Sequence, residues 1–496
     1  MADITLKLTG KINRRFPANE GDPLTEPLVR DNLLSRNGRL KKPGGTEKVS
    51  TTALSDRARW MSRYYSFEVG VVSPKTFIYT KDGYLYLQND MGGAPTLIRS
   101  DLSTNAYPRS KLIKYSEQVY LYFVDGFNLY KYDGNNDNRF DKVSSGVPTP
   151  FEPIDIEEHL DRLWCIDKSR LYSSANLDFD NFLHATDSLD IVVGSGKGTN
   201  LRVIKLPTTD SLYIFTTEGI FKLSGDTISA VATTFGITQV SDKKAISFGS
   251  IHQVENGVIF MADDYELYSF DGYGSYKMVS YKEKLSDLVN TYRVNQAQST
   301  YFNNYYQLSF CEKGETENKI EIWYDALEDK CEFVRGRNVA YYLEIDSSRE
   351  VGYQQFGRSD SNYIMWAERG LNFDGSAIQV RLLSRDITPK KFEEVRFTDF
   401  YLDLEPTGER DMFFRYLLDG RLSDLDEKAN DYFSLEGEAK FLGLIRIANQ
   451  KQKWLRIQPK IKYSRGTSIA LEITDATIDL DFSLLSMGIN FIGGKG

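Results

Sequence analysis

The stretch VYLYFVDGFNLYKYDG (119–134) consists of two aromatic-rich runs on either side of the pair Asp125-Gly126. Tyr, Phe and Val favour β-strands. A glycine between two such runs permits the positive φ that a tight turn needs. The stretch therefore predicts a β-hairpin. Its first run, VYLYFV, is apolar on both faces, which indicates a strand that is covered on both sides.

Six further stretches repeat this pattern along the chain. Their predicted turns lie at Asp82-Gly83, near Asp167, at Glu218-Gly219, and near Asp264, Gly314 and Asp360. A β unit that recurs about every 40–50 residues is typical of a β-propeller, whose blades are buried between their neighbours. We therefore expect an all-β protein with a propeller of about seven blades. A long array of β-sandwiches with coincidental spacing is the competing interpretation.

The repeat ends near residue 376, although strand-like runs continue beyond it. In TSIALEITDATIDLDF (467–482), Ile469, Leu471 and Ile473 alternate with other residues, which predicts one buried and one exposed sheet face. We expect a C-terminal antiparallel β-sandwich. The predicted domains are an N-terminal arm with lead-in strands (1–70), the propeller (71–378) and the sandwich (379–496). The segment 281–297 is the best candidate for a single short helix.

The composition excludes several classes of protein. Only three cysteines, Cys165, Cys311 and Cys331, occur in 496 residues, so a disulfide framework is excluded and each thiol is expected to be buried. One bridge between Cys311 and Cys331 across a hairpin remains an alternative. The start MADITLKLTGK lacks an apolar segment of the signal-peptide type. The sequence contains no run of about 18 apolar residues, so it predicts no membrane span.

The charge is distributed unevenly along the chain. The net charge is −9 overall, made up of +6 over residues 1–63 and −15 over the remainder. A basic segment on an acidic body predicts docking onto an acidic neighbour or onto nucleic acid, with chance variation as the alternative. The candidate contact residues for a subunit or for DNA are Arg14, Arg15, Arg36, Arg39, Lys41 and Lys42. Sequence-specific DNA binding by the acidic body is not expected.

Motifs that resemble catalytic or metal sites do not meet the requirements of those sites. GSGKGTN (194–200) places Gly198 where a phosphate-binding loop needs Ser or Thr, so it predicts an inter-blade loop. DGNNDNRFDKVS (133–144) has calcium-type spacing but lacks the Gly and Glu of an EF-hand, and predicts a solvated turn. His159 is expected to have a structural role. We therefore predict no enzyme activity, no cofactor and no metal site.

One region resembles a known family. HLDRLWCIDKSRLYSSANLDFDNF (159–182) is similar to a stretch of short-tailed bacteriophage tail-hub or nozzle proteins, the packaged-DNA stabilisation proteins. The matching residues are His159, Arg162, Leu163, Trp164, Tyr172, Ser173, Asn181 and Phe182. The segments 30–49, 212–226 and 249–273 also resemble that family. At the third of these, the family has Asp-Gly where Tyr265-Glu266 follows Asp264, so a longer or bulged hairpin is expected there.

The resemblance implies a structural protein of the virion tail, assembled in the host cytoplasm. The resemblance implies that its copies form a six-membered ring below a head–tail adaptor. Packaged double-stranded DNA would pass through this ring between the subunits, without sequence-specific binding. An acidic lumen would let the phosphates slide, and the basic N-terminal segment would clamp adjacent subunits. Two alternatives stay open: a glycan-binding or glycan-cleaving propeller, such as a tail-associated depolymerase, and a generic protein-binding propeller scaffold.

Overall fold

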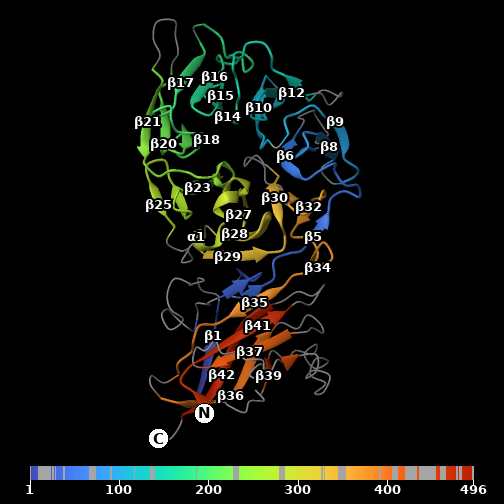
Figure 1. Ribbon diagram of the computed structural model, residues 1–496, viewed down its shortest axis with the longest axis vertical. Helices are drawn as coiled ribbons and strands as arrows, with labels where there is room; N and C mark the ends of the chain where they lie inside the picture. Colours follow the sequence, from blue (N-terminus) through green and yellow to red (C-terminus); the bar gives the residue numbers. More distant parts are fainter. Residues whose placement is uncertain are drawn as a thin grey trace.

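The protein is a β-propeller joined to a β-sandwich, as the computed structural model shows (Figure 1). The propeller forms one end of the elongated molecule, and the sandwich, with both chain termini, forms the other. The structure describes residues 2–8, 24, 27, 29–36, 39–65, 74–89, 92–104, 106–116, 118–134, 140–185, 187–226, 234–278, 285–325, 328, 330–343, 354–389, 393–404, 412–418, 433–434, 454–457, 465–475, 479 and 483–493.

The first five blades are separate four-stranded antiparallel sheets, each made from consecutive strands. In chain order their strands are β6 (Ala58–Tyr64), β7 (Lys75–Thr80), β8 (Leu85–Asn89) and β9 (Thr96–Arg99); β10 (Arg109–Tyr115), β11 (Gln118–Val124), β12 (Leu129–Tyr132) and β13 (Asp141–Lys142); β14 (Asp155–His159), β15 (Arg162–Ile166), β16 (Arg170–Ser173) and β17 (Leu189–Val192); β18 (Asn200–Leu206), β19 (Ser211–Thr216), β20 (Ile220–Ser224) and β21 (Gly236–Ser241); β22 (His252–Val254), β23 (Gly257–Met261), β24 (Leu267–Phe270) and β25 (Ser275–Lys277).

The last two blades pair with strands from near the start of the chain. Blade 6 consists of β26 (Gln298–Phe302), β27 (Tyr305–Cys311), β28 (Asn318–Asp325) and β29 (Lys330–Arg335), and blade 7 of β30 (Val339–Tyr342), β31 (Gln355–Arg358), β32 (Ile364–Ala367) and the N-terminal strand β5 (Thr46–Lys48). The short hairpin of β33 (Asn372–Phe373) and β34 (Ser376–Ala377) extends blade 7 beyond β5. Strand β5 thus closes the propeller from near the start of the chain.

The seven predicted turns all lie between the second and third strands of their blades. The first strands of neighbouring blades contact one another around the propeller axis. Each second strand is covered on both sides: Phe123 packs with Trp60 of blade 1, whereas the next residue, Val124, packs with Leu163 of blade 3. This confirms the seven-bladed propeller and the reason for its doubly apolar strands.

The expectation of a longer or bulged hairpin at Asp264 is wrong. Strands β23 and β24 pair without a register shift. Ala262 N donates to Glu266 O at 2.9 Å, just as Thr80 N donates to Tyr84 O at 2.9 Å in blade 1. Tyr265 takes the left-handed conformation (φ 58°) that Gly83 takes in the other turn (φ 85°). A non-glycine residue occupies this position at some cost in strain, and the turn length is unchanged.

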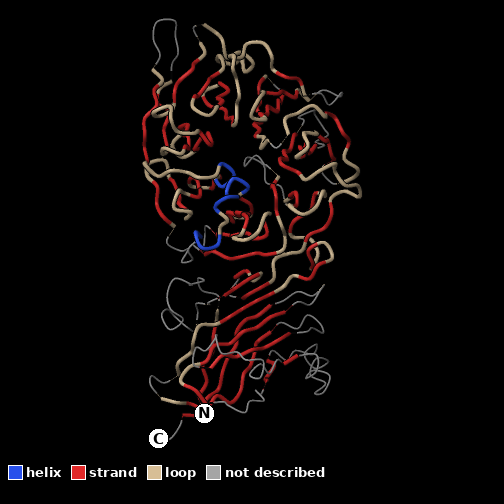
Figure 2. Tube along the Cα trace, viewed as in Figure 1, coloured by secondary structure: helices blue, strands red, loops and turns tan. Residues whose placement is uncertain are grey.

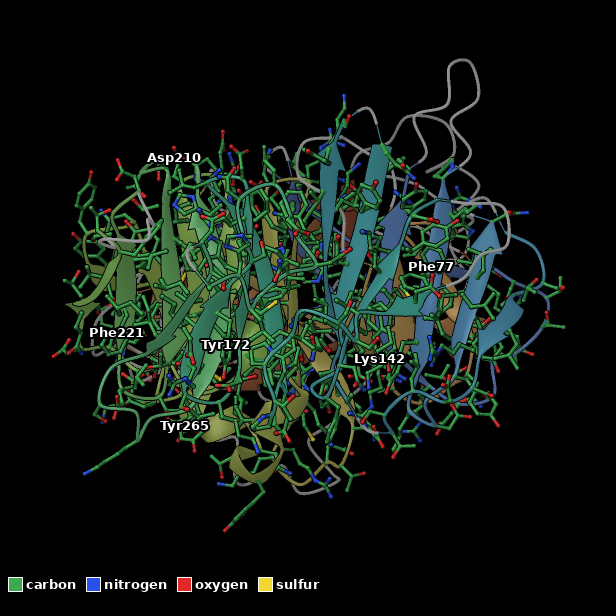
Figure 3. The ribbon with its side chains drawn as sticks, turned by 90° about the horizontal axis from the view of Figure 1, so that it is seen from above. Phe77, Lys142, Tyr172, Asp210, Phe221 and Tyr265 are labelled. Atoms are coloured by element: carbon green, nitrogen blue, oxygen red, sulfur yellow. The ribbon has the colours of Figure 1, made fainter. Side chains whose placement is uncertain are left out.

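The helical expectation for 281–297 also needs correction. Within the described part of this segment there are two short helices, α1 (Leu285–Leu288) and the 3-10 helix η2 (Thr291–Gln296). The Asn290 side chain accepts a hydrogen bond from Tyr292 N at 3.1 Å, which starts a new helix there. A third short helix, η1 (Phe248–Ser250), precedes β22. In Figure 2, α1 lies near the rim of the propeller on the side of the sandwich, and the other helical segments lie closer to the centre of the ring.

The sandwich contains two sheets that face each other across an aliphatic core. One sheet has the order β3-β4-β42-β36-β39, with β1 paired to β42 and β40 to β36, and the other continues from blade 6 as β29-β2-β35-β41-β37-β38. The bounds are β1 (Ala2–Leu6), β2 (Val29–Asp31), β3 (Leu34–Arg36), β4 (Arg39–Lys41), β35 (Val380–Leu383), β36 (Val395–Leu404), β37 (Met412–Leu418), β38 (Phe433–Ser434), β39 (Trp454–Ile457), β40 (Arg465–Gly466), β41 (Ile469–Asp475) and β42 (Ser483–Gly493).

Strand β2 connects the two halves of the molecule. Asp31 of β2 pairs in parallel with Phe333 of β29, and β2 pairs antiparallel with β35. A single nine-stranded sheet therefore runs from blade 6 into the sandwich. Residues 1–70, predicted as an arm with lead-in strands, contain sandwich strands, the closing strand β5 and the first propeller strand β6.

Candidate functional site

The N-terminal basic residues that were candidates for intermolecular contacts lie mainly within the fold. Lys42 is buried, and its Nζ lies 2.8 Å from Asp475 Oδ2 of β41. Arg36 is partly exposed, and its Nη2 lies 3.5 Å from Glu368 Oε2. Arg39 and Lys41 are half-buried in β4, beside β42. Arg14 and Arg15 lie outside the described residues.

Lys42 therefore binds its own chain in this conformation and is not on the surface. Sequence reasoning could assign its charge but not its partner, because Asp475 is more than 400 residues away along the chain. Of the candidate contact residues within the described parts of the chain, Arg36, Arg39 and Lys41 keep some exposure.

A second buried ion pair fixes β2 against blade 6. Arg30 Nη2 lies 3.1 Å from Glu332 Oε1, and both side chains are almost fully buried. Glu332 Oε1 also accepts a hydrogen bond from Ser35 N at 2.5 Å, and Arg30 Nη1 donates to Leu8 O at 3.1 Å. Burial raises the pKa of Glu332 and lowers that of Arg30, and each partner opposes the shift of the other. Sequence analysis did not single out this pair.

The propeller axis is filled by charged and aromatic side chains near the face that carries the predicted turns. The Arg109 guanidinium lies 4.9 Å from the ring centroid of Phe248 and donates a hydrogen bond to the Tyr341 hydroxyl. Phe248 contacts Tyr107 edge-on, and Arg59 lies 4.6 Å from the Tyr107 ring centroid. These residues come from four inner strands or inter-blade loops and meet at the axis.

Asp155, Arg202 and His252 form a second electrostatic group, in which the Asp155 side chain is buried and Arg202 and His252 keep partial exposure. Arg202 Nε lies 3.6 Å from Asp155 Oδ2, and that oxygen accepts a hydrogen bond from Val203 N at 2.8 Å. Burial raises the pKa of Asp155 to about 6 against the opposing effect of Arg202 and Arg109. Burial, together with Arg202 and Arg109, lowers the pKa of His252 well below its usual range. Side chains, not an open hole, thus occupy this part of the axis.

The residues that carry the family resemblance build blade 3. Trp164 Nε1 donates to His159 O at 2.9 Å, and Arg162 binds both the backbone and the carboxylate of Asp187. The Tyr172 hydroxyl donates to Asp167 Oδ2 at 3.0 Å at the predicted turn. These contacts give the motif a structural explanation within the blade. His159 therefore acts through its backbone carbonyl, in keeping with the expected structural role.

The glycine-rich stretch 194–200 links β17 to β18, which confirms an inter-blade loop. Its local occupant is a carboxylate of the same chain: Glu218 accepts hydrogen bonds from Ser195 N (3.0 Å) and from the Ser195 hydroxyl. These bonds hold the pKa of Glu218 below its usual range. A Cβ on Gly194 or Gly198 would come within 2.6 Å or 2.4 Å of Glu218, so the close approach requires glycine.

A cleft of about 540 Å³ adjoins this loop between blades 3 and 4. The residues that line it are Val192, Gly194, Ser195, Glu218, Phe221, Ile237, Gln239 and Lys244. They come from β17, the inter-blade loops, the β19–β20 turn, β20 and β21. The Glu218-Gly219 turn and the glycine-rich loop were each recognisable in the sequence. Their juxtaposition was not, because it depends on how adjacent blades stack.

The remaining candidates for chemistry give no assembled centre in the described parts of the chain. No group of three or more His, Cys, Asp or Glu residues there could hold a metal ion. Of the calcium-like residues, Asn135 and Asp137 lie outside the described residues. Cys165, Cys311 and Cys331 are buried free thiols, so the alternative of a Cys311–Cys331 bridge is not realised. No described helix is long and apolar enough to cross a membrane.

Comparison with known proteins finds distant structural similarity and no family. No family model and no curated protein matches the chain. It is similar to the structure of Raptor from Chaetomium thermophilum, with 10% identity, a TM-score of 0.44, and coverage of 68% of this chain but only 30% of Raptor. It is also similar to the Pan2 WD40 domain from Neurospora crassa, with 7% identity, a TM-score of 0.41 and coverage of 67% and 98%.

A third similar structure is BBS1N in complex with ARL6DN, with 14% identity, a TM-score of 0.40 and coverage of 69% of this chain and 99% of that one. At these identities and TM-scores the similarities assign neither a family nor a function to this chain.

Proposed function

We propose that this chain is a non-enzymatic structural protein of a bacteriophage tail, whose copies form a ring around the DNA path. The observation that carries the proposal is the continuous sheet from blade 6 to the sandwich, because it makes one elongated rigid subunit out of two domains. A rigid subunit suits a load-bearing ring better than two domains on a linker would.

Two further observations support this proposal. The stretch that resembles tail-hub proteins forms strands and a turn of blade 3, which the Trp164–His159 and Tyr172–Asp167 hydrogen bonds stabilise. The side chains of Arg109, Phe248 and Tyr341 fill part of the propeller axis, so a duplex would have to pass between subunits. The acidic net charge of −9 favours sliding of DNA over gripping.

Electron microscopy of the purified full chain, alone and mixed with a head–tail adaptor, tests this proposal. We expect closed rings, with six subunits as the first expectation, and labelling of the tail by antibodies in intact virions. Particles that stay monomeric under both conditions and an absence of the protein from virions would contradict it. Deletion of residues 1–45 is a poor test of a clamp, because it removes β1 to β4 from the sandwich.

The exposed basic positions offer a cleaner test of the clamp. The double variant Arg39→Glu/Lys41→Glu reverses charge on β4 at two partly exposed positions. If β4 contacts an acidic neighbour, this variant should fail to form rings yet keep the circular dichroism spectrum of the parent. The matched variant Lys168→Glu/Lys197→Glu changes the same number of charges on exposed propeller loops. Equal ring formation by both variants and the parent would remove β4 from the interface.

A further inference from the structure

We infer that the cleft between blades 3 and 4 is a binding site for a neutral oligosaccharide. This inference does not rest on ring formation, and it assigns a ligand to the only part of the described surface where the glycine-rich loop, a carboxylate and an apolar wall meet in one cavity. Its volume of about 540 Å³ is within the range of small-molecule sites, about 300–1,000 Å³.

The polar side of the cleft contains hydrogen-bonding groups of both kinds. Glu218 supplies carboxylate oxygens, Lys244 an ammonium group, Gln239 an amide and Ser195 a hydroxyl. Gln239 Nε2 donates a hydrogen bond to Ser241 O at 3.2 Å. This bond fixes the orientation of the Gln239 amide and leaves its Oε1 atom as an acceptor. Sugar hydroxyls both donate and accept, so they match such a mixed set.

The charges in the cleft favour a neutral ligand. One carboxylate, Glu218, and one ammonium group, Lys244, line it, and the exposed Lys197 of the glycine-rich loop acts electrostatically on Glu218. An anionic ligand would meet Glu218, which the Ser195 hydrogen bonds keep ionised, and a cationic ligand would meet Lys244. A ligand without net charge can form hydrogen bonds with both groups and is repelled by neither the Glu218 carboxylate nor the Lys244 ammonium group.

Apolar side chains form part of the cleft wall beside these polar groups. Val192 is 43% exposed at the end of β17, while Phe221 is almost fully buried beneath Gly194. Ile237 continues this wall on β21. A sugar ring presents C–H groups on its faces and hydroxyls around its edge, so it can cover the apolar wall while it bonds to the polar side.

The glycine-rich loop keeps the cleft in place. Ser195 is pinned to Glu218 by two hydrogen bonds, and Thr199 N donates to Thr217 Oγ1 at 2.9 Å. Gly219, in a positive-φ conformation, lies against Gln239, where a Cβ would be 2.5 Å from Nε2. These contacts within the chain hold the lining of the cleft in position, which reduces the entropy cost of binding.

The experiment uses the purified full chain on an array of neutral di- to tetrasaccharides of hexoses and N-acetylhexosamines. We expect at least one of these saccharides to bind. Gln239→Ala and Lys244→Ala should each weaken that binding about tenfold through the loss of one hydrogen-bonding group. Val192→Trp should abolish it, because the larger side chain occupies the cleft.

Two matched controls separate loss of contact from loss of fold. Thr238→Ala changes the neighbouring exposed residue of β21, whose side chain is on the other face of the strand, and Lys168→Ala removes an exposed charge from another turn. Both should bind as the parent does. Absence of binding to every saccharide on the array would overturn the inference, and so would binding that survives all three cleft variants.

Discussion

The contact between blades 1 and 2 and the contacts at the edge of blade 6 depend on different forces. Between blades 1 and 2, Trp60, Phe123 and Tyr130 stack, with ring centroids 5.4 Å and 4.7 Å apart. Around blade 6, two buried ion pairs replace such stacking: Arg30 with Glu332, and Arg337 with Glu321, whose Nε and Oε1 are 3.4 Å apart. Aromatic contacts between consecutive blades can accommodate small shifts in packing. A buried ion pair strongly destabilises any register that separates its partners, because each charge is then buried without a counter-charge.

This difference follows the connectivity of the chain. Blades 1 and 2 are made of consecutive strands, so their pairing is fixed by short turns. Blade 6 is also made of consecutive strands, but its edge strand β29 pairs with β2 from about 300 residues away, and nothing local sets the register of that contact. The buried Arg30–Glu332 pair supplies a specific partner for each side, and the predictions below test how much of the stability depends on it.

The largest effect should come from removing one partner of this pair. Glu332→Ala leaves the Arg30 guanidinium buried without its carboxylate, and we expect the free energy of unfolding to fall by about 3–5 kcal/mol. Urea denaturation followed by tryptophan fluorescence measures this loss. The double variant Arg30→Met/Glu332→Leu should recover most of it, since it buries no charge. A loss below about 1 kcal/mol for Glu332→Ala would place the specificity of the junction elsewhere.

A comparable effect should follow from the buried acid at the propeller axis. The folded-state pKa of Asp155 is raised to about 6, so between pH 4 and pH 6 the folded chain retains a proton that the unfolded chain has lost. Its contribution to stability should therefore fall as pH rises through this window, by about 3 kcal/mol in all. The parent and Asp155→Asn should be compared by denaturation at several pH values. Parallel pH profiles would contradict the raised pKa.

A smaller effect should arise at the closing strand of blade 7. Gly45 precedes β5, and a Cβ there would meet Asn372 O at 2.4 Å and Asn372 N at 2.7 Å. Because both are backbone atoms, Gly45→Ala should cost about 1–3 kcal/mol and raise the hydrogen exchange of β5 and β32. Gly236→Ala is the matched control, since no atom lies within 4 Å of its Cβ. Equal stability of the two variants would show that β5 adapts freely.

The smallest effect should be found between blades 1 and 2. Phe123→Leu keeps an apolar side chain of similar size among Trp60, Tyr130 and Phe140 but loses their ring contacts. We expect a loss of about 1–1.5 kcal/mol in the free energy of unfolding, well below that of Glu332→Ala. Calorimetry of both variants in one buffer makes the comparison direct. A reversed order would mean that aromatic stacking is the more demanding of the two forces.

The propeller was predictable because its repeat is local. Asp82, Asp125 and Asp167 lie in tight turns between adjacent strands, and the residues that specify each turn are next to it in the sequence. The closing strand was not predictable in the same way. β5 is three residues long, with the sequence TEK, and its partners in β32 and β33 lie more than 300 residues later.

The candidate site shows the same division. The glycine-rich loop and the Glu218-Gly219 turn were recognised separately, and the rejection of a phosphate-binding loop follows from local residues, Ile191 and Gly198, and from the strand predicted after them. That Glu218 occupies the loop depends on the stacking of blade 4 on blade 3, which no spacing in the sequence reveals. Likewise, the charge of Lys42 was visible, but its burial against Asp475 was not.

The position of β2 and β5 also has a consequence for biosynthesis. Both strands leave the ribosome early, yet their partners β29 and β32 are made roughly 300 residues later. At a synthesis rate of about 5–20 residues per second, the two strands wait for roughly 15–60 seconds. During that interval the first five blades can form as an open arc, with the nascent N-terminus exposed to chaperones, and the ring of blades closes only when the sixth and seventh emerge.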